Sequence, residues 1–269
     1  MADREGAPVR IEFLTQEDSL YILPFFEEFL RHYGSEFEIA RISCCRTMGK
    51  RSRVRLVREL LWLYGGSGLA RLLLQAGTAR ALAMLPRDRS APRFYSIAQL
   101  ARAHSISCQP VADPNQAEFT DGLRKRAAKV LISVACPYIL KEKVLHSPPL
   151  GCINIHHAPL PRYRGMMPTF WQLYHGEPEL GITIHTMAAK VDEGAALLQE
   201  FLPIMPGQSL HNLIRQSKRH GAHCMARVLR SLRANAATPI PLDHAQGSYF
   251  TFPRRDEALE FRRRGLRAI

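Results

Sequence analysis

Hydrophobic positions divide this chain into short apolar runs that alternate with longer segments of helical spacing. Five runs have the length and the branched residues of strands, at residues 9–14, 37–45, 130–136, 151–155 and 181–187. Helical spacing occupies residues 20–33, 117–129 and 209–233. Strands separated by helix-length segments favour βαβ units. We therefore predict an α/β fold, a Rossmann-like and mostly parallel sheet flanked by helices.

Residues 50–90 interrupt this pattern with a stretch rich in Leu and Arg. Its spacing predicts an inserted helical pair that breaks at Gly65 and Gly66. Two interpretations stay open. The pair packs on the sheet with its arginines in water, or it forms a basic amphipathic surface for a membrane or an acidic partner. We take the packed pair as the simpler expectation.

Composition adds little to the fold class but bears on the cellular setting. Apolar residues make up 46% and charged residues 23% of the 269 residues, as in an ordinary globular protein. No apolar run is long enough to span a membrane, and the first residues lack the apolar core of a secretion signal. The six cysteines show no CxxC spacing. We expect reduced, mostly buried thiols in a cytoplasmic protein.

The net charge of +13 calls for a partner or another cause. It is concentrated in residues 50–93 and 254–267. Basic patches favour nucleic acid, anionic lipid or phosphorylated substrates, and an Arg-rich soluble surface explains them equally well. The sequence contains neither GxGxxG after its first strand nor GxxxxGK[ST], so it lacks the glycines of a dinucleotide site or a P-loop.

Candidate chemistry lies where the apolar strand at residues 151–155 runs into polar residues. Asn154 and His156 are two positions apart and therefore share one face of the strand, whereas His157 points to the other. An amide donor beside a titratable imidazole suits a carbonyl oxygen that gains negative charge during a reaction. Asp192, in a turn after the strand at 181–187, offers a carboxylate that orients a water or the imidazole.

A zinc site is the competing interpretation of these histidines. It would use His156, His157, His175 and His185. Their spacing does not match the usual His and Cys ligand patterns, so we predict no metal.

Together, these segments resemble the folate-dependent formyltransferases. The shared pattern is Asn154-Ile155-His156, the loop APLPRYRG, Gly181-Ile182-Thr183-Ile184-His185, and Asp192-Glu193-Gly194. His156 and Asp192 are 36 residues apart, as in the family. The resemblance implies an enzyme whose catalytic residues are Asn154, His156 and Asp192. It implies a catalytic domain at residues 1–202, followed by a C-terminal helix and a short aromatic and basic tail at residues 203–269.

The resemblance also implies 10-formyltetrahydrofolate as the formyl donor. Its pterin would lie against Tyr138, Ile139 and Leu140, which follow the strand at residues 130–136. The opposite wall would be formed by the segment that holds Met187, Val191 and Asp192. An apolar slot lined by backbone groups suits a flat heterocycle with polar edges.

The acceptor is expected to be a primary amine. Arg162, Tyr163, Arg164 and Gly165 form the loop beside the site, and arginines there suit phosphate or carboxylate recognition. The segments PTFWQLYHGE and GITIHTM look closer to the amino-sugar N-formyltransferases, so a small amine such as a nucleotide-linked amino sugar is preferred. A methionyl-tRNA formyltransferase that lacks the usual C-terminal domain is the alternative, and a non-catalytic folate- or nucleic-acid-binding module is a third. We also expect a homodimer and allow peripheral membrane contact through residues 50–90.

Overall fold

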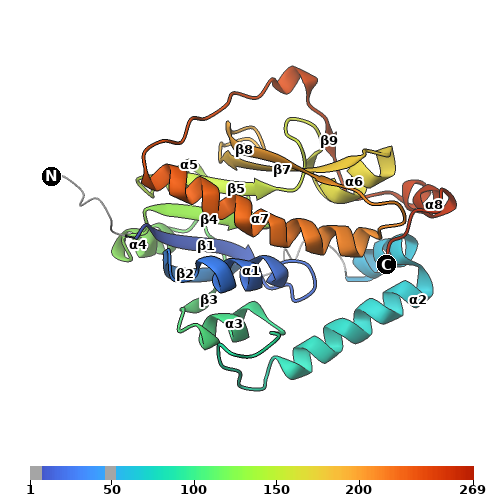
Figure 1. The fold of residues 1–269 in the computed structure, drawn as a ribbon, viewed down its shortest axis with the longest axis horizontal. Coiled ribbons are helices and arrows are strands. Elements are labelled where there is room, and N and C mark those ends of the chain that lie inside the picture. Colours follow the sequence, from blue (N-terminus) through green and yellow to red (C-terminus); the bar gives the residue numbers. More distant parts are fainter. Residues whose placement is uncertain (1–7, 46–52) are drawn as a thin grey trace.

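The computed structural model of the protein describes residues 8–45 and 53–269 (Figure 1). The strands are β1 (Arg10–Gln16), β2 (Glu38–Cys45), β3 (Cys108–Val111), β4 (Val130–Val134), β5 (Cys152–His156), β6 (Arg164–Gly165), β7 (Glu179–Thr186), β8 (Ala196–Pro203) and β9 (Tyr249–Phe250). The helices are α1 (Leu23–Tyr33), α2 (Arg53–Leu82), α3 (Ile97–Ala103), α4 (Ala117–Lys125), α5 (Glu142–Leu145), α6 (Pro168–His175), α7 (Leu210–Arg233) and α8 (Arg255–Arg263), with a short 3-10 turn at His244–Gln246.

Seven strands form the central sheet in the order β3-β2-β1-β4-β5-β7-β8. The first five are parallel to one another, whereas β7 runs antiparallel to β5 and β8 antiparallel to β7. The predicted α/β class with a mostly parallel sheet is confirmed. The sequence pattern did not indicate β3 or β8. β3 is a four-residue edge strand that contains Pro110, and β8 is half-exposed along most of its length.

Alternation along the strands sends side chains to two separate cores. On β1, Ile11 and Phe13 join the core under α1, α3 and α7, while Leu14 joins the core under α4 and α5. Phe13 meets Phe25 and Phe29 of α1 edge-on, with ring centroids 6.0 and 5.2 Å apart. Each fully buried aromatic ring of this kind contributes about 1.5–3 kcal/mol. The sheet is therefore covered on both faces, which explains its nearly continuous apolar strands.

The first helix begins later than its apolar pattern predicts. The side chain of Asp18 accepts hydrogen bonds from the amides of Leu20 and Tyr21, both at 2.8 Å, and so forms a turn before the helix. Pro24 stands in the first turn of α1, where it needs no amide hydrogen. Gly34 ends the helix as predicted, with its amide bonded to the carbonyl of Leu30.

The long helix α2 breaks at Gly65, as its sequence predicts. Gly65 has φ of 70° and ψ of 176°, a conformation that favours glycine. The half before the break packs near α8, and the half after it runs along an outer edge of the molecule (Figure 1). Residues 50–52 of the predicted insertion lie outside the described residues.

The C-terminal segment crosses the molecule twice. Helix α7 begins at Ser209, whose side chain accepts a hydrogen bond from the amide of Asn212, and it packs on the sheet beside α1 (Figure 1). The chain then returns through β9, which pairs with β6, and ends in α8. All six cysteines are free, and Cys45, Cys152 and Cys224 are buried. Within the described residues, no helix is long and apolar enough to cross a membrane.

Candidate active site

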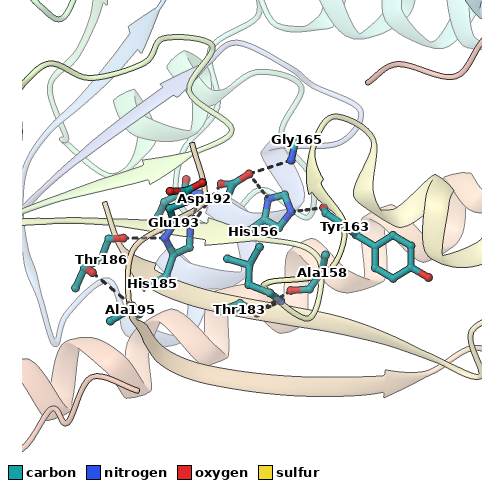
Figure 2. A network of polar contacts seen from close by, with 12 residues as sticks. His156, Ala158, Tyr163, Gly165, Thr183, His185, Thr186, Asp192, Glu193 and Ala195 are labelled. Carbon is teal, nitrogen blue, oxygen red and sulfur yellow. Dashed lines mark hydrogen bonds and ion pairs between the residues drawn. The ribbon is translucent and has the colours of Figure 1, made fainter. Parts of the chain in front are cut away.

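Two neighbouring strands bring the candidate residues together at one end of the sheet. β5 and β7 are antiparallel, and their register places Asn154 opposite His185 and His156 opposite Thr183. Asn154 and His156 share a face of β5 with Cys152, which belongs to the core under α4 and α5. The turn after β7 carries Asp192 back to this face, so that Figure 2 shows Asp192 between the imidazoles of His156 and His185.

The imidazole of His156 has a polar neighbour at each nitrogen. Nε2 lies 2.8 Å from the carbonyl oxygen of Tyr163, and because a carbonyl only accepts, Nε2 donates. Nδ1 lies 3.6 Å from Oδ2 of Asp192. With Nε2 protonated, Nδ1 of the neutral ring carries the lone pair and is the nitrogen that takes up a proton. Burial lowers the pKa of His156 below its usual value, although the carboxylate of Asp192 opposes that shift. At neutral pH the ring is therefore a proton acceptor.

Asp192 is fixed in an ionised form. Burial alone would raise its pKa, but His156, His185 and the amide of Gly165 outweigh burial and hold the pKa at about 2. That amide donates to Oδ2 at 3.1 Å, and Oδ1 lies 3.6 Å from Nε2 of His185. Asp192 has φ of 55°, a left-handed conformation that few residues other than glycine and the Asx pair adopt.

His185 supports Asn154 from the neighbouring strand. Nδ1 of His185 donates to the carbonyl of Thr186 at 2.8 Å, which leaves Nε2 as an acceptor. Nδ2 of Asn154 lies 3.1 Å from that Nε2 and supplies the hydrogen. An amide group has two hydrogens on nitrogen, so one stays available to a ligand while the other fixes the side chain. Asn154 is thereby a pre-oriented hydrogen-bond donor beside the proton acceptor on His156.

The turn that carries Asp192 fits tightly against β7. A Cβ at Gly194 would overlap the carbonyl oxygen of Thr186, so only glycine fits there without a backbone shift. Glu193 accepts a 2.6 Å hydrogen bond from Nη1 of Arg164, and its carbonyl accepts a 3.1 Å bond from the ring of His244. The turn is therefore anchored by the loop after β5 and by the C-terminal tail.

Thr183 holds the first part of the loop after β5. Its hydroxyl is buried, donates to the carbonyl of Ala158 at 2.7 Å, and accepts from the amide of Leu160 at 3.1 Å and from Nε2 of Gln199 at 3.0 Å (Figure 2). One hydroxyl thus ties β8 and the loop to β7. This explains why a threonine stands in the buried middle of β7.

The predicted substrate loop is built into the same network. Arg162 donates to Glu177 at 2.7 Å, as the hydroxyl of Tyr163 does at 2.6 Å, and Arg164 bonds Glu193. Both arginines are therefore engaged by carboxylates. The loop contacts the site directly through its backbone. The carbonyl of Tyr163 accepts a hydrogen bond from His156, and the amide of Gly165 donates one to Asp192. Substrate binding by these four residues stays a prediction.

The C-terminal tail holds this loop in place. Ser248 accepts the amide hydrogen of Tyr163 on its side chain and that of Arg164 on its carbonyl, both at 2.9 Å. The ring of Phe250 stacks on Tyr163 with centroids 5.5 Å apart. No sequence pattern indicated this role of the tail, because the contact joins segments 85 residues apart.

The residues assigned to the folate slot lie on two sides of the site. Tyr138 and Met187 both pack against the core that contains Leu140, the same core that the Asn154 face of β5 joins. Ile139 is exposed, and its carbonyl accepts a 3.1 Å hydrogen bond from Asn115. Val191 is partly exposed in the turn before Asp192. Asn115, which also accepts the amide hydrogen of Lys141 at 2.7 Å, shapes this loop, and the sequence pattern did not mark it.

The histidines of the zinc alternative do not converge. His157 faces α7, where a Cβ at Gly221 would lie 3.3 Å from its Cε1, and both its ring nitrogens are buried without a hydrogen-bond partner. His175 caps its own helix through the carbonyl of Trp171. Within residues 8–45 and 53–269, three ligand-type side chains meet elsewhere, on β8 and α7: Glu200, His220 and Cys224. That carboxylate is already bonded to His220 and to Arg227.

His185 belongs to the candidate site through its contacts with Asn154 and Asp192. The sequence pattern placed it in the shared motif but predicted no such contacts for it. The sequence contained part of this information, because residues directly opposite each other on neighbouring strands have side chains on the same face of the sheet. What the sequence left open was the antiparallel pairing of β5 and β7, which brings His185 opposite Asn154.

The fold and this polar cluster define an α/β protein in which Asn154, His156 and Asp192 meet at the inner strands β5 and β7 of a mostly parallel sheet. The sequence profile of the formyl transferase family matches residues 89–229, slightly more than half of the chain. The chain therefore belongs to the formyl transferase family, and the predicted resemblance is confirmed.

Known relatives agree with this membership. Methionyl-tRNA formyltransferase of Synechococcus sp. (strain JA-3-3Ab) is 40% identical over 151 residues, which cover 56% of this chain and 47% of that protein. The chain spans about half the length of the curated relatives it matches.

Solved structures show the same fold. Glycinamide ribonucleotide transformylase 1 from Symbiobacterium toebii superposes with a TM-score of 0.58 at 16% identity, covering 89% of this chain and 96% of that one. The N-formyltransferase from Helicobacter canadensis, in complex with folinic acid and dTDP-3-aminofucose, gives a TM-score of 0.58 at 14% identity over 97% of this chain and 84% of that one.

Proposed function

We propose that this protein is an N-formyltransferase that moves a formyl group from 10-formyltetrahydrofolate to a primary amine. The observation that carries the proposal is the cluster in which Asn154 keeps a free amide hydrogen beside the proton-accepting nitrogen of His156, with Asp192 ionised next to it. Family membership supports this chemistry. The sequence placed the same three residues in these roles.

The residues around the cluster fit a reduced folate. The side chains of Tyr138, Leu140 and Met187 give an apolar wall beside the Asn154 face of β5, and an apolar wall with few polar groups suits a flat heterocycle. When bound, the folate supplies the formyl group, carried on one of its nitrogens. The Helicobacter canadensis relative of the same fold was solved with folinic acid, itself a formylated folate, which agrees with this assignment.

Each catalytic residue then has one task. Nδ2 of Asn154 donates its second hydrogen to the formyl oxygen as that oxygen gains negative charge. Nδ1 of His156 takes the proton that the amine loses as its nitrogen bonds to the formyl carbon, and returns it to the folate nitrogen whose bond to that carbon breaks. Asp192 stabilises the imidazolium in between, because its carboxylate stays ionised. The amine must be neutral to attack.

A pocket on the α1 and α7 side of the sheet, away from the Asn154 face of β5, carries positive charge. The loop after β1, α1, α2 and α7 enclose about 240 Å³, with the guanidinium groups of Arg93 and Arg215 in the lining and Glu27 as its acid. Lys218 is buried one turn from Arg215, and burial lowers its pKa to about 8. Arginines suit phosphate recognition. We place a phosphate-bearing amine, such as a nucleotide-linked amino sugar, before other acceptors because residues 168–177 and 181–187 resemble the amino-sugar N-formyltransferases.

Methionyl-tRNA is the second candidate acceptor, and the names of the closely matching relatives favour it. The net charge of +13 agrees with it as well, since phosphate contacts dominate affinity for nucleic acids. A gel shift with tRNA across a salt series separates the two candidates. Absence of binding at moderate salt would remove the tRNA.

The activity is tested by incubating the protein with 10-formyltetrahydrofolate and a panel of amines while free tetrahydrofolate is measured. Removing the donor of Asn154 with Asn154→Ala should lower the rate about 100- to 1000-fold without unfolding the protein. His156→Ala should lower it by at least 100-fold. Near-normal turnover in either folded variant would contradict the assignment. Tetrahydrofolate release without an amine would instead indicate hydrolysis. A cytoplasmic location and a homodimer stay predictions.

A further inference from the structure

The outward side of α2 exposes large apolar side chains. After the break at Gly65, Leu69, Leu72 and Ala79 face inward and are buried. Leu73 and Leu74 face outward, 58% and 69% exposed. A helix on the surface of a globular protein normally turns charged and polar residues outward. Here two leucines stand among the outward residues of a helix half that runs along the outer edge of the molecule (Figure 1).

The apolar character continues beyond the helix, and it is accompanied by positive charge alone. Met84 and Leu85 follow α2 and are 83% and 51% exposed. Residues 60–87 contain no Asp or Glu but include Arg71 and Arg80, both exposed. Isolated exposed leucines need no explanation, but a row of them on one helix marks an interaction surface.

The half of α2 before the break repeats this arrangement. Val54, Val57 and Leu61 are exposed and lie one helical turn apart. Beside them a pocket of about 480 Å³ opens between α2 and the start of α8. Its lining includes the arginines Arg55, Arg58, Arg254 and Arg255 and the ring of Trp62, with Glu59 and Asp256 as its acids. Arg55 bonds Glu59 at 2.9 Å, and the guanidinium of Arg58 stands over the ring of Trp62. Such a pocket suits a phosphate group.

We propose that α2 and this adjoining pocket dock the protein on an anionic membrane surface. Exposed Leu, Val and Met beside arginines are the signature of a helix that lies in the interface between lipid headgroups and acyl chains. Within the described residues no helix is able to cross the membrane, so the contact is peripheral. The pocket with its four arginines takes a lipid phosphate while the apolar side chains enter the acyl boundary.

Charge and apolar surface together favour an anionic bilayer over a second copy of the chain or a nucleic acid. A second copy of the chain would bring the same arginines face to face, with few carboxylates between them. A nucleic acid would match the arginines but leave the leucines in water. An anionic bilayer satisfies both the charge and the apolar surface.

Cosedimentation of the full chain with vesicles tests this docking. Vesicles of equal parts phosphatidylglycerol and phosphatidylcholine should retain the protein, and vesicles of phosphatidylcholine alone should retain much less. The double variant Leu73→Ser, Leu74→Ser should lower the partition coefficient at least about tenfold. Arg71→Gln together with Arg80→Gln should lower it roughly 30-fold and reduce its salt dependence, while the arginines of the pocket keep the remainder.

Matched controls keep the test independent of folding and of activity. Met205→Ser and Ile240→Ser remove equally exposed apolar side chains elsewhere, and Arg31→Gln with Lys125→Gln removes two exposed charges elsewhere. These variants should partition like the unchanged protein, apart from a small loss due to net charge. Circular dichroism verifies the fold of each variant.

Three results would overturn the proposal. The first is no binding of the full chain to anionic vesicles at low salt. The second is equal loss of binding in the α2 variants and their controls, which would indicate general charge attraction. The third is a concentration-dependent dimer in sedimentation that the Leu73→Ser, Leu74→Ser variant abolishes, because the face would then be covered by a second copy. None of these readouts depends on formyl transfer.

Discussion

Two regions of this molecule depart from the usual placement of polar and apolar residues, in opposite ways. At the ends of β5 and β7, polar side chains are buried, and those of the candidate cluster have polar neighbours, as His156 has in Tyr163 and Asp192, although the ring nitrogens of His157 have none. Along α2, large apolar side chains such as Leu74 stand in solvent without such partners. Buried polar groups and exposed apolar rows are both costly unless something offsets them. In the first region, hydrogen bonds within the protein offset the cost of burial. In the second region, only a partner outside the chain would cover the apolar side chains.

Substitutions should therefore act differently in the two regions. In the first region a small change disturbs several hydrogen bonds at once and should reach the chemistry. In the second, a small change alters only the surface and should leave the fold intact or improve it.

Among substitutions beyond Asn154 and His156 themselves, the largest effect is expected on removing the charge of Asp192. Asp192→Asn leaves the protonated ring of His156 without its carboxylate, so formyl transfer should fall about 100-fold. Because that carboxylate raises the pKa of His156 against the effect of burial, its loss should move the acid limb of the pH–rate profile to lower pH. Steady-state rates between pH 4.5 and 8 measure both effects.

The exposed carboxylate of Glu179, on β7, offers the control for that experiment. Glu179→Gln should leave the rate and the acid limb unchanged. An acid limb that stays in place in Asp192→Asn would mean that Asp192 acts only through the shape of its turn.

Substitution of Gly194 should give the next largest effect. Since a Cβ there overlaps the carbonyl oxygen of Thr186, Gly194→Ala must push the turn away from β7. We expect a loss of about 3 kcal/mol in the free energy of unfolding, measured by urea denaturation, with a further loss of activity as Asp192 shifts. Gly207→Ser, where nothing lies within 4 Å, controls for glycine replacement, although its φ of 74° adds a small cost. An unchanged stability would show that the turn relaxes freely.

Acid should destabilise the protein through its buried histidines. Burial lowers the pKa of His157 well below its usual value, so below about pH 6.5 the unfolded chain binds a proton that the folded chain does not. Stability is therefore full above that pH and declines as the pH falls, by about 1.4 kcal/mol per pH unit for each such group. His157→Leu should make the decline shallower, as measured by denaturation at pH 5, 6 and 7.

The control for this pH series is His146→Gln, a substitution at an exposed position. It should keep the slope of the unchanged protein. The same slope in His157→Leu would show that another group carries the acid sensitivity, with His156 the first to consider because burial lowers its pKa too.

Much of the first region was predictable from the sequence, because strand alternation alone puts Asn154 and His156 on one face and His157 on the other. The break in α2 at Gly65 was predictable for a similar local reason. The partners of the site were not. Tyr163 contributes a backbone carbonyl, which no side-chain pattern reveals. The hydrogen bonds from Ser248 to the loop depend on the path that the chain takes after α7, on its way to β9 and α8.

How α2 packs could be predicted only in part from its sequence. Its composition indicated both a packed pair and a basic amphipathic surface, and the structure shows elements of each, since Leu72 is buried and Leu74 exposed. The balance was unpredictable because it depends on how α6, α8 and the C-terminal residues meet the helix. Local periodicity cannot supply that tertiary information.

The smallest expected effect is also the sharpest contrast with Gly194. Gly77 lies in the outward face of α2, and nothing stands within 4 Å of the position that a Cβ would take. Gly77→Ala restricts the unfolded chain and adds no clash, so it should raise the free energy of unfolding by about 0.5–1 kcal/mol. Thermal denaturation with and without anionic vesicles measures this gain. A loss of stability in solution would mean that the outward face of α2 already packs against another part of the protein or a second copy. The exposed apolar side chains of α2 would then already be covered by protein, as the polar side chains of the candidate site are.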